Sequence, residues 1–310
     1  GSKRLAIHPP APLSGAISQA AAESLIRSAG GDLAALLATP GPSFAAVPLR
    51  LRATFEVATA VETIKSNNVI GRLRGTSGGG ESLLYLAHWD HLGQCEPEAV
   101  DRICNGAVDN ASGIAALLEI ARAFGKAPRP KRDVLFLATT AEEMGLLGAE
   151  YFAAGPTVPL SSIVTAINMD TLAIAPKGEK VAVMGRGHAA LDALIDRTVA
   201  EAGRTLDGDD EAAAFVERQD GWALARAGVP AIMVNGSFAD MRKLGAFLGG
   251  AYHSAADNPG PGLVLDGAAE DTDLMIALGR KLADPERFPA RPRSDLNGGA
   301  RAGVAPPVRR

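Results

Sequence analysis

Short, almost continuously apolar runs separated by helical segments constrain the fold of this 310-residue chain more than any other feature. These runs cover residues 82–88, 133–138, 163–168 and 230–234. Such runs predict strands that are covered on both faces, as in parallel sheets packed between helices. The sequence therefore predicts an α/β fold, with a mostly parallel mixed sheet covered by helices on both faces.

The segments between these runs complete the predicted order of elements. Helices are expected at about 112–124, 144–153, 188–202 and 264–283, with a β-like stretch at 180–184. Residues 16–37 predict short helices that are broken at Gly30-Gly31. Two stretches near 47–60 and 67–73 alternate as strands do.

Acidic residues and histidines gather where the predicted strands end. In "LAHWDHLG", residues 86–93, the first strand delivers His88 and Asp90. The same kinds of residue follow the next two strands or precede a helix: Asp109, Glu142, Glu143, Asp170 and His253. Ligands in open α/β sheets bind beyond the carboxyl ends of the strands, so we expect these side chains to lie close together.

Metal ions are the partners that this set of side chains favours. Imidazole and carboxylate groups without sulfur suit catalytic zinc, and a bridging carboxylate with further histidines and acids suits two metals about 3.5–4 Å apart. Each residue also has an ordinary explanation: Asp109 could cap a helix, and Glu142 and Glu143 could form an exposed first helical turn. All the ordinary explanations together would require five independent coincidences, so we predict a metal centre.

Five motifs in this order resemble the M28 family of zinc peptidases, which includes bacterial leucyl aminopeptidases and glutamate carboxypeptidases. The motifs are "AHWDHLG", "NGAVDNASG", "TTAEEMGLLGAEYF", "INMD" and "YHSAADN". The resemblance spans about residues 82–260 and implies two Zn²⁺ ions per chain. It implies that His88 and Asp170 bind one zinc, that Glu143 and His253 bind the other, and that Asp109 bridges them.

The same resemblance implies roles for the neighbouring residues. Glu142 would be the general base, Asp90 would orient the His88 imidazole, and Tyr252 would steady the developing oxyanion. His91 is not a ligand in the family and is interpreted as part of the loop structure. The chain has Gln219-Asp220-Gly221 where the family usually has Ser-Asp-His.

These roles predict a di-zinc metallopeptidase, in the first place an aminopeptidase that acts on peptide substrates. A single-zinc acyltransferase related to glutaminyl cyclases is an alternative, and a metal-free binding protein on the same fold is another. A serine hydrolase is disfavoured because "GTSGG", residues 75–79, precedes a strand instead of linking a strand to a helix.

The rest of the sequence sets the expected organisation. Residues 1–50 are similar to part of a protease-associated domain with its linker, residues 51–285 would form the catalytic domain, and residues 286–310 an irregular tail. The net charge of −4 disfavours nucleic acid as a partner, and no apolar run is long enough to span a membrane. The sequence does not indicate an oligomeric state.

The two cysteines, Cys95 and Cys104, lie nine residues apart in a polar loop. A local disulfide is favoured over a pair of free thiols, and a zinc-binding pair is disfavoured because the chain has no further cysteine. A disulfide needs an oxidising compartment, and Gly1-Ser2 is typical of a cleavage remnant. We therefore expect a periplasmic or secreted protein whose signal peptide and leading segment have been removed.

Overall fold

The structure is a computed structural model that describes residues 16–38, 48–49, 51–52, 58, 60, 62–78, 80–96 and 98–289. The chain divides into two compact units, residues 6–65 and the part from Ser66 onward. In the first unit, helices α1 (Gln19–Ser28) and α2 (Leu33–Leu37) are capped by Ser18 and Asp32. The predicted break between two short helices is confirmed, whereas the strand predicted near 47–60 falls largely outside the described residues.

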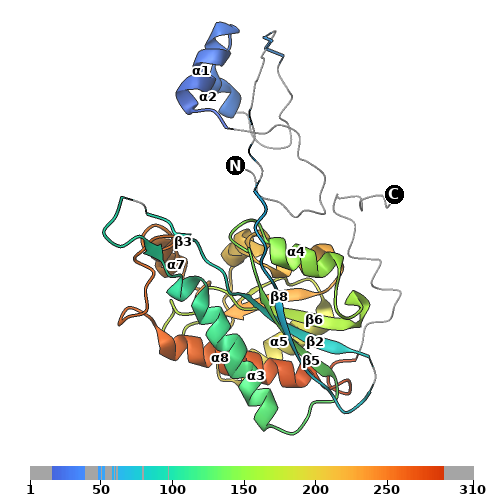
Figure 1. Ribbon diagram of the computed structural model, residues 1–310. Coiled ribbons are helices and arrows are strands. Elements are labelled where there is room, and N and C mark those ends of the chain that lie inside the picture. The colour runs from blue at the N-terminus through green and yellow to red at the C-terminus, as the bar shows by residue number, and fades with distance from the viewer. Residues whose placement is uncertain are drawn as a thin grey trace, which may run out of the picture. The chain divides into compact units, whose positions relative to one another are not determined.

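A six-stranded sheet forms the centre of the second unit (Figure 1). Its strands, in spatial order, are β1 (Val69–Leu73), β5 (Asp133–Thr139), β2 (Ser82–His88), β6 (Ile163–Asn168), β8 (Ala231–Asn235) and β7 (Ala182–Met184). The four inner strands are parallel, and the two edge strands are antiparallel to their neighbours. The predicted mostly parallel mixed sheet is confirmed.

Helices cover both faces of this sheet. Helices α3 (Ser112–Lys126), α5 (Ala189–Glu201) and α8 (Leu265–Leu282) share one hydrophobic cluster with the sheet. Helices α4 (Leu147–Ala154) and α6 (Gly221–Arg226) share a second cluster with its other face. Figure 1 shows α3 and α8 together on the side away from α4. The sequence did not predict α6 or α7 (Met241–Leu248).

The central strand β2 shows why the predicted runs are apolar without alternation. All seven of its residues are buried, because Leu83 and Tyr85 face one cluster while Leu84 faces the other. The Tyr85 hydroxyl donates to the carbonyl of Met275 at 2.8 Å, which satisfies its buried polar atom. A Cβ at position 279 would lie 1.6 Å from this hydroxyl, so Gly279 permits the close approach of α8 to the sheet.

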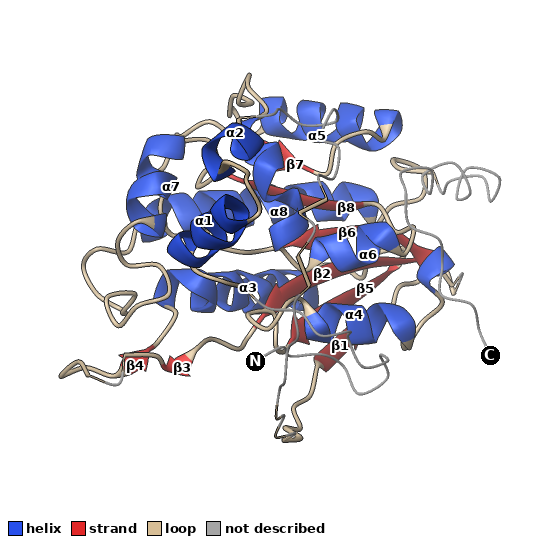
Figure 2. Ribbon diagram, turned by 90° about the horizontal axis from the view of Figure 1, so that it is seen from above, coloured by secondary structure: helices blue, strands red, loops and turns tan. Residues whose placement is uncertain are grey.

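Shorter elements complete the second unit. They are 3₁₀ helices at Leu160–Ser162 and Glu211–Arg218, a turn at Ala107–Ala111 that is not helical at Asp109 and Asn110, and strands β3 (Gly93–Gln94) and β4 (Ile103–Cys104). Figure 2 shows β3 and β4 as a separate hairpin beside the main sheet. Among the described helices, none combines the length and apolar character needed to cross a membrane.

Candidate metal centre

The polar residues at the strand ends come together at one edge of the sheet. His88 is the last residue of β2, Glu142 and Glu143 lie in the turn that follows β5, and Asp170 follows β6. Since these strands are parallel, their carboxyl ends meet at the same edge. The helix α4 begins only at Leu147, so the two glutamates do not form an exposed first helical turn.

Asp109 lies between two histidines. Its Oδ1 is 3.2 Å from Nε2 of His88, and its Oδ2 is 3.3 Å from Nε2 of His253. His253 Nε2 also lies 2.8 Å from Oε2 of Glu143, while His88 Nε2 lies 3.7 Å from Oδ2 of Asp170. The carboxylate of Asp109 thus links two pairs of polar side chains and makes no helix cap. All five predicted ligands belong to one cluster.

The donor atoms of this cluster fit bound zinc. Nitrogen and oxygen ligands about 2.1 Å from a tetrahedral zinc lie roughly 3.4 Å from one another, close to most of the distances around Asp109. His88, Asp109 and Glu143 present donor atoms that all lie within 4.8 Å of one another, as do His88, Glu142 and Asp170. The buried Nε2 of His253 and Oε1 of Glu143 have no hydrogen-bond partner within the described part of the chain. These orphaned atoms are what a metal would satisfy.

The electrostatics of the cluster also favour a cation. Burial by itself lowers the pKa of His88, but the carboxylates of Asp170 and Asp109 outweigh burial and hold that pKa well above its ordinary value. Burial raises the pKa of Asp109, yet the nearby imidazoles of His253 and His88 bring that pKa below its usual range. Carboxylates outnumber histidines here, and buried charges require partners of opposite sign. A divalent cation would supply that charge.

Glu142 is the acid of the cluster whose pKa is raised most clearly. Burial is the main cause and brings the pKa of Glu142 to about 10, although the charge of His88 opposes this shift. The backbone N–H of Glu142 donates to Oδ1 of Asp90 at 3.2 Å. That carboxylate oxygen lies 3.8 Å from Nδ1 of His88, whereas the backbone carbonyl of Asp90 is 3.1 Å from the same nitrogen. Asp90 therefore touches His88 chiefly through its main chain and positions Glu142 through its side chain.

His91 lies closer to the centre than the sequence indicated. Its Nδ1 is 2.6 Å from Oε1 of Glu143, and its ring packs edge-on against that of His253 with centroids 5.6 Å apart. The geometry of this contact is not that of a hydrogen bond, so both atoms lack a hydrogen-bond partner among the described residues. Gly106, with a positive φ of 67°, lies against this ring, and a Cβ there would be 2.5 Å from it. The interpretation of His91 as loop structure alone is incomplete, because His91 also contacts a predicted ligand.

Two buried polar side chains that the sequence analysis missed tie the ligand loops together. Asn110 donates from Nδ2 to the carbonyl of Met169 at 2.9 Å, next to Asp170. Both oxygens of the Asp257 carboxylate accept backbone N–H groups, from Val108 at 2.9 Å and from Asp109 at 3.1 Å. Asp257 thus fixes the loop of His253 against the loop of Asp109. Asn110 and Asp257 both lie within the motifs quoted above. Their closeness in the sequence to Asp109 and His253 is the signal that could have identified them.

We expect the substitution Asp257→Asn to weaken zinc binding by roughly 10- to 100-fold, as losses of outer hydrogen-bond partners do. An amide offers only one acceptor oxygen for two backbone donors, so the two loops would no longer be held together. Zinc affinity is measured by competition with a chromogenic chelator, with Asp266→Asn on the exposed start of α8 as the matched control. Equal affinities for both variants and the original protein would show that Asp257 does not position the ligands.

Strained backbone flanks the candidate ligands. Among the described residues other than glycine, Ala141, Leu146, Thr171 and His253 have positive φ angles. Ala141 precedes Glu142, Thr171 follows Asp170, and His253 is itself a predicted ligand. Left-handed backbone is unfavourable for residues with a Cβ and tends to persist at functional sites.

The chain has Gln219-Asp220-Gly221 where the family usually has Ser-Asp-His, and this difference has a local structural explanation. The buried side chain of Gln219 turns back, accepting from the N–H of Gly221 at 2.8 Å and donating to the carbonyl of Val216 at 3.1 Å. A Cβ at position 221 would lie 2.6 Å from Oε1 of Gln219, so the glutamine fills the space of the absent side chain. Asp220 is retained beneath the site, where it accepts from Thr139, and burial raises its pKa to about 6.

A cavity opens onto the candidate metal centre. Its wall includes acids of the centre together with polar and apolar side chains: Asp109, Glu142, Asp170, Thr171, Phe215, Arg218, Gln219, Met233, Phe238, Leu244, Leu248 and Tyr252. The ring of Tyr252 stacks on that of His253 with centroids 3.7 Å apart. Burial, together with the charges of Asp109 and Glu143, raises the pKa of Tyr252, so its hydroxyl stays protonated and can donate.

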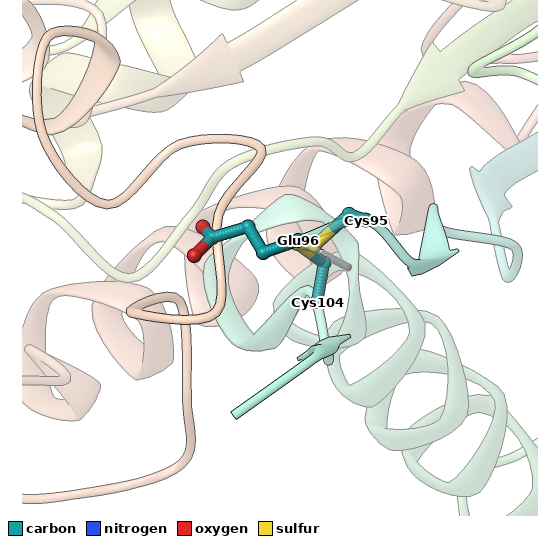
Figure 3. A group of neighbouring side chains, drawn as sticks. All are labelled: Cys95, Glu96 and Cys104. Carbon is teal, nitrogen blue, oxygen red and sulfur yellow. A yellow bond between two sulfur atoms is a disulfide. The ribbon is translucent and has the colours of Figure 1, made fainter. Parts of the chain in front are cut away.

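The loop between Asp90 and Asp109 is closed by a disulfide. Cys95 and Cys104 are bonded, with their Cα atoms 5.8 Å apart, which confirms the predicted pair (Figure 3). Figure 3 also shows the carboxylate of Glu96 pointing away from the two sulfur atoms. Its Oε1 accepts from the N–H of Ala255 at 3.1 Å, two residues after His253. The oxidised cysteines do not form a metal site, and the hairpin instead contacts the loop of His253.

We expect Cys95→Ser to lower the free energy of unfolding by up to about 2.7 kcal/mol, the chain-entropy value for a closed loop of about ten residues. Urea unfolding of the oxidised protein, the reduced protein and the variant measures the difference. The reduced protein and the variant should agree. An unchanged urea midpoint on reduction, or two alkylated cysteines in the unreduced denatured protein, would exclude a stabilising disulfide.

The candidate site lies within the segment of the chain that matches a known protein family. The model of the family described as "Peptidase family M28" matches residues 68–264, which is more than half of the chain. A vacuolar membrane protease from Candida dubliniensis is 34% identical over 96 residues, 31% of this chain and 9% of that protein. A probable zinc metalloprotease from Pyrenophora teres f. teres is 33% identical over 107 residues, 34% of this chain and 23% of that protein.

The fold is also found among solved structures. A zinc aminopeptidase from Bacillus subtilis has a TM-score of 0.54 at 19% identity, covering 71% of this chain and 50% of that one. At this identity the likeness concerns the fold. The chain spans about half of this solved structure and a quarter or less of the two curated relatives.

Proposed function

Since the chain belongs to peptidase family M28, we propose that its metal centre is the active site of a two-zinc aminopeptidase. One observation carries the proposal: the two oxygens of Asp109 face two different histidines, His88 and His253. A carboxylate in this position can be shared by two metals. The names of relatives that are zinc peptidases support zinc as the metal.

In this proposal His88 and Asp170 would hold one zinc, Glu143 and His253 would hold the other, and both would share Asp109. Zinc, when bound, supplies Lewis-acid activation of water and of the scissile carbonyl. The contact of Nδ1 of His88 with the carbonyl of Asp90 makes that nitrogen the donor and leaves Nε2 free as a ligand.

The other residues of the chain handle the proton and the developing charge. The positive charge of bound zinc would oppose the effect of burial on the pKa of Glu142 and favour its ionised form. Glu142 would then take a proton from the attacking water and return it to the leaving amine, as a positioned carboxylate can. Its backbone is held by Asp90, which keeps the carboxylate close to His88 and Asp170. The hydroxyl of Tyr252 at the cavity wall donates to the oxygen of the tetrahedral intermediate.

The cavity supports release of an N-terminal residue. A protonated α-amino group beside an apolar side chain is complementary to a wall that combines carboxylates with Met233, Phe238 and Leu244. These carboxylates would repel a negatively charged group of the substrate at the same end of the cavity, unless a positive charge lies beside that group. Burial of an apolar side chain in the cavity would add binding free energy.

Blocked peptides test this proposal. The zinc-loaded protein is incubated with a neutral pentapeptide, its N-acetylated form and its C-amidated form, and products are followed by mass spectrometry. Release of the first residue, abolished by acetylation and unchanged by amidation, is the expected result. Release of the last residue would indicate a carboxypeptidase, and loss of ammonia without hydrolysis from a further pentapeptide that begins with glutamine would indicate a cyclase.

A further inference from the structure

One cation lies in the wall of the cavity, opposite in charge to the acids of the metal centre. Arg218 is the last residue of the 3₁₀ helix Glu211–Arg218 and lines the cavity together with Asp109, Glu142 and Asp170. It is an exposed residue, so its charged group can be reached from solvent. None of the roles given above to the ligands, Glu142 or Tyr252 requires an arginine at this position.

Two contacts hold the guanidinium of Arg218 in place. Its Nη2 donates to the hydroxyl of Tyr252 at 3.4 Å, and its Cζ lies 5.5 Å from the centre of the Phe215 ring, within the range of a cation–π contact. Among the described residues, no carboxylate lies within the 4.0 Å of an ion pair with it. Arg226, eight residues further along the chain, instead pairs with Glu150.

The guanidinium of arginine is a planar fork that matches a carboxylate with two parallel hydrogen bonds. Ordinary surface arginines are simply hydrated, but Arg218 is fixed against Phe215 and Tyr252 at the wall of the catalytic cavity. A substrate carboxylate entering here would meet the repulsion of the acids, and Arg218 provides the opposing charge.

We propose that Arg218 forms a carboxylate-binding subsite, so that preferred substrates carry a negative group close to the bond that is cleaved. This inference rests on the proposed aminopeptidase function and specifies its substrate class. The carboxylate has two possible sources: an acidic side chain on the N-terminal residue, or the free C-terminus of a dipeptide or tripeptide. The apolar part of the cavity, with Met233 and Leu244, would receive the methylene groups of the substrate.

Two substrate pairs distinguish these sources in the zinc-loaded protein. The first pair compares N-terminal aspartate with N-terminal asparagine in otherwise identical C-amidated pentapeptides. The second compares the free acid and the amide of a leucyl dipeptide. For each pair the ratio of kcat/KM is measured for the original protein, for Arg218→Gln and for the matched control Arg226→Gln.

We expect Arg218→Gln to lower one of the two ratios by roughly tenfold, the effect of losing a charged hydrogen bond. The affected pair identifies the source of the carboxylate, and Arg226→Gln should leave both ratios unchanged. Added salt should also reduce the affected ratio in the original protein.

Other results would overturn the subsite. Unchanged ratios would show that Arg218 does not bind the carboxylate, and an equal loss of kcat on every substrate would show that it acts only by positioning Tyr252. If the neutral peptides are hydrolysed and the ratios of kcat/KM are unchanged in Arg218→Gln, the subsite is ruled out but the proposed function is not. If the original protein hydrolyses none of the peptides, the proposed function fails first and this inference fails with it.

Discussion

Replacing Glu142 by glutamine is expected to lower kcat by about 10² to 10⁴ fold, while the protein keeps its zinc. The amide has nearly the same shape as the carboxylate but cannot accept the proton of the attacking water. The hydrogen bond from the backbone N–H of Glu142 to the carboxylate of Asp90 does not depend on the side chain of Glu142. The turn that carries Glu143 should therefore stay in place. Steady-state kinetics and zinc analysis of the same preparation measure both effects.

Glu143→Gln is the matched control, because it makes the same chemical change one residue further along. Oε2 of Glu143 lies 2.8 Å from Nε2 of His253, so this substitution should weaken zinc binding instead of removing the base. Excess zinc should recover part of the activity of Glu143→Gln and none of the activity of Glu142→Gln. If the two variants had the same zinc content and the same rate, the division of roles between the two glutamates would be wrong.

Asp109→Ala is expected to have the second large effect, loss of zinc from both positions. The Asp109 carboxylate contacts His88 on one side and His253 on the other, so in the proposed two-zinc site its removal would affect both metals at once. The loss of affinity should exceed the roughly 10- to 100-fold that follows removal of an outer hydrogen-bond partner. Zinc content after dialysis against a weak chelator measures it.

Asp170→Ala is the comparison for that variant, since Asp170 contacts His88 and not His253. It should release zinc from one position only. An Asp109→Ala protein that retained one tightly bound zinc would contradict a shared carboxylate.

The sequence predicted those elements of the fold whose hydrophobic pattern is long and lies within one continuous stretch of the chain. The buried strands and the helix α8 have unbroken apolar runs or a long helical pattern, and each lies within a few residues of its predicted position. Helices α6 and α7, of 6 and 8 residues, were not predicted, although α4, which also has 8 residues, was. Isolated helices of that length are not stable and form through tertiary packing, which a local pattern does not contain.

The gathering of the candidate ligands could be predicted because parallel strands end at a common edge. The contacts around them could not, since Asp257 and Val108 are 149 residues apart and meet only in the folded chain. The same holds for His91, whose contact with Glu143 depends on the course of the loop around Gly106. Gln219 and Gly221 show a further limit, because their departure from the usual motif is explained by a side chain that folds back on its own turn.

Zinc titration of the chelated protein is the most direct test of the central claim, that the cluster around Asp109 is a two-zinc peptidase site. Bound zinc and peptide hydrolysis are measured in the same samples as zinc is added back. We predict that the zinc-free protein is inactive, and that activity returns with zinc and reaches its maximum at two ions per chain. Full hydrolysis after exhaustive chelation, with no zinc bound, would contradict the claim.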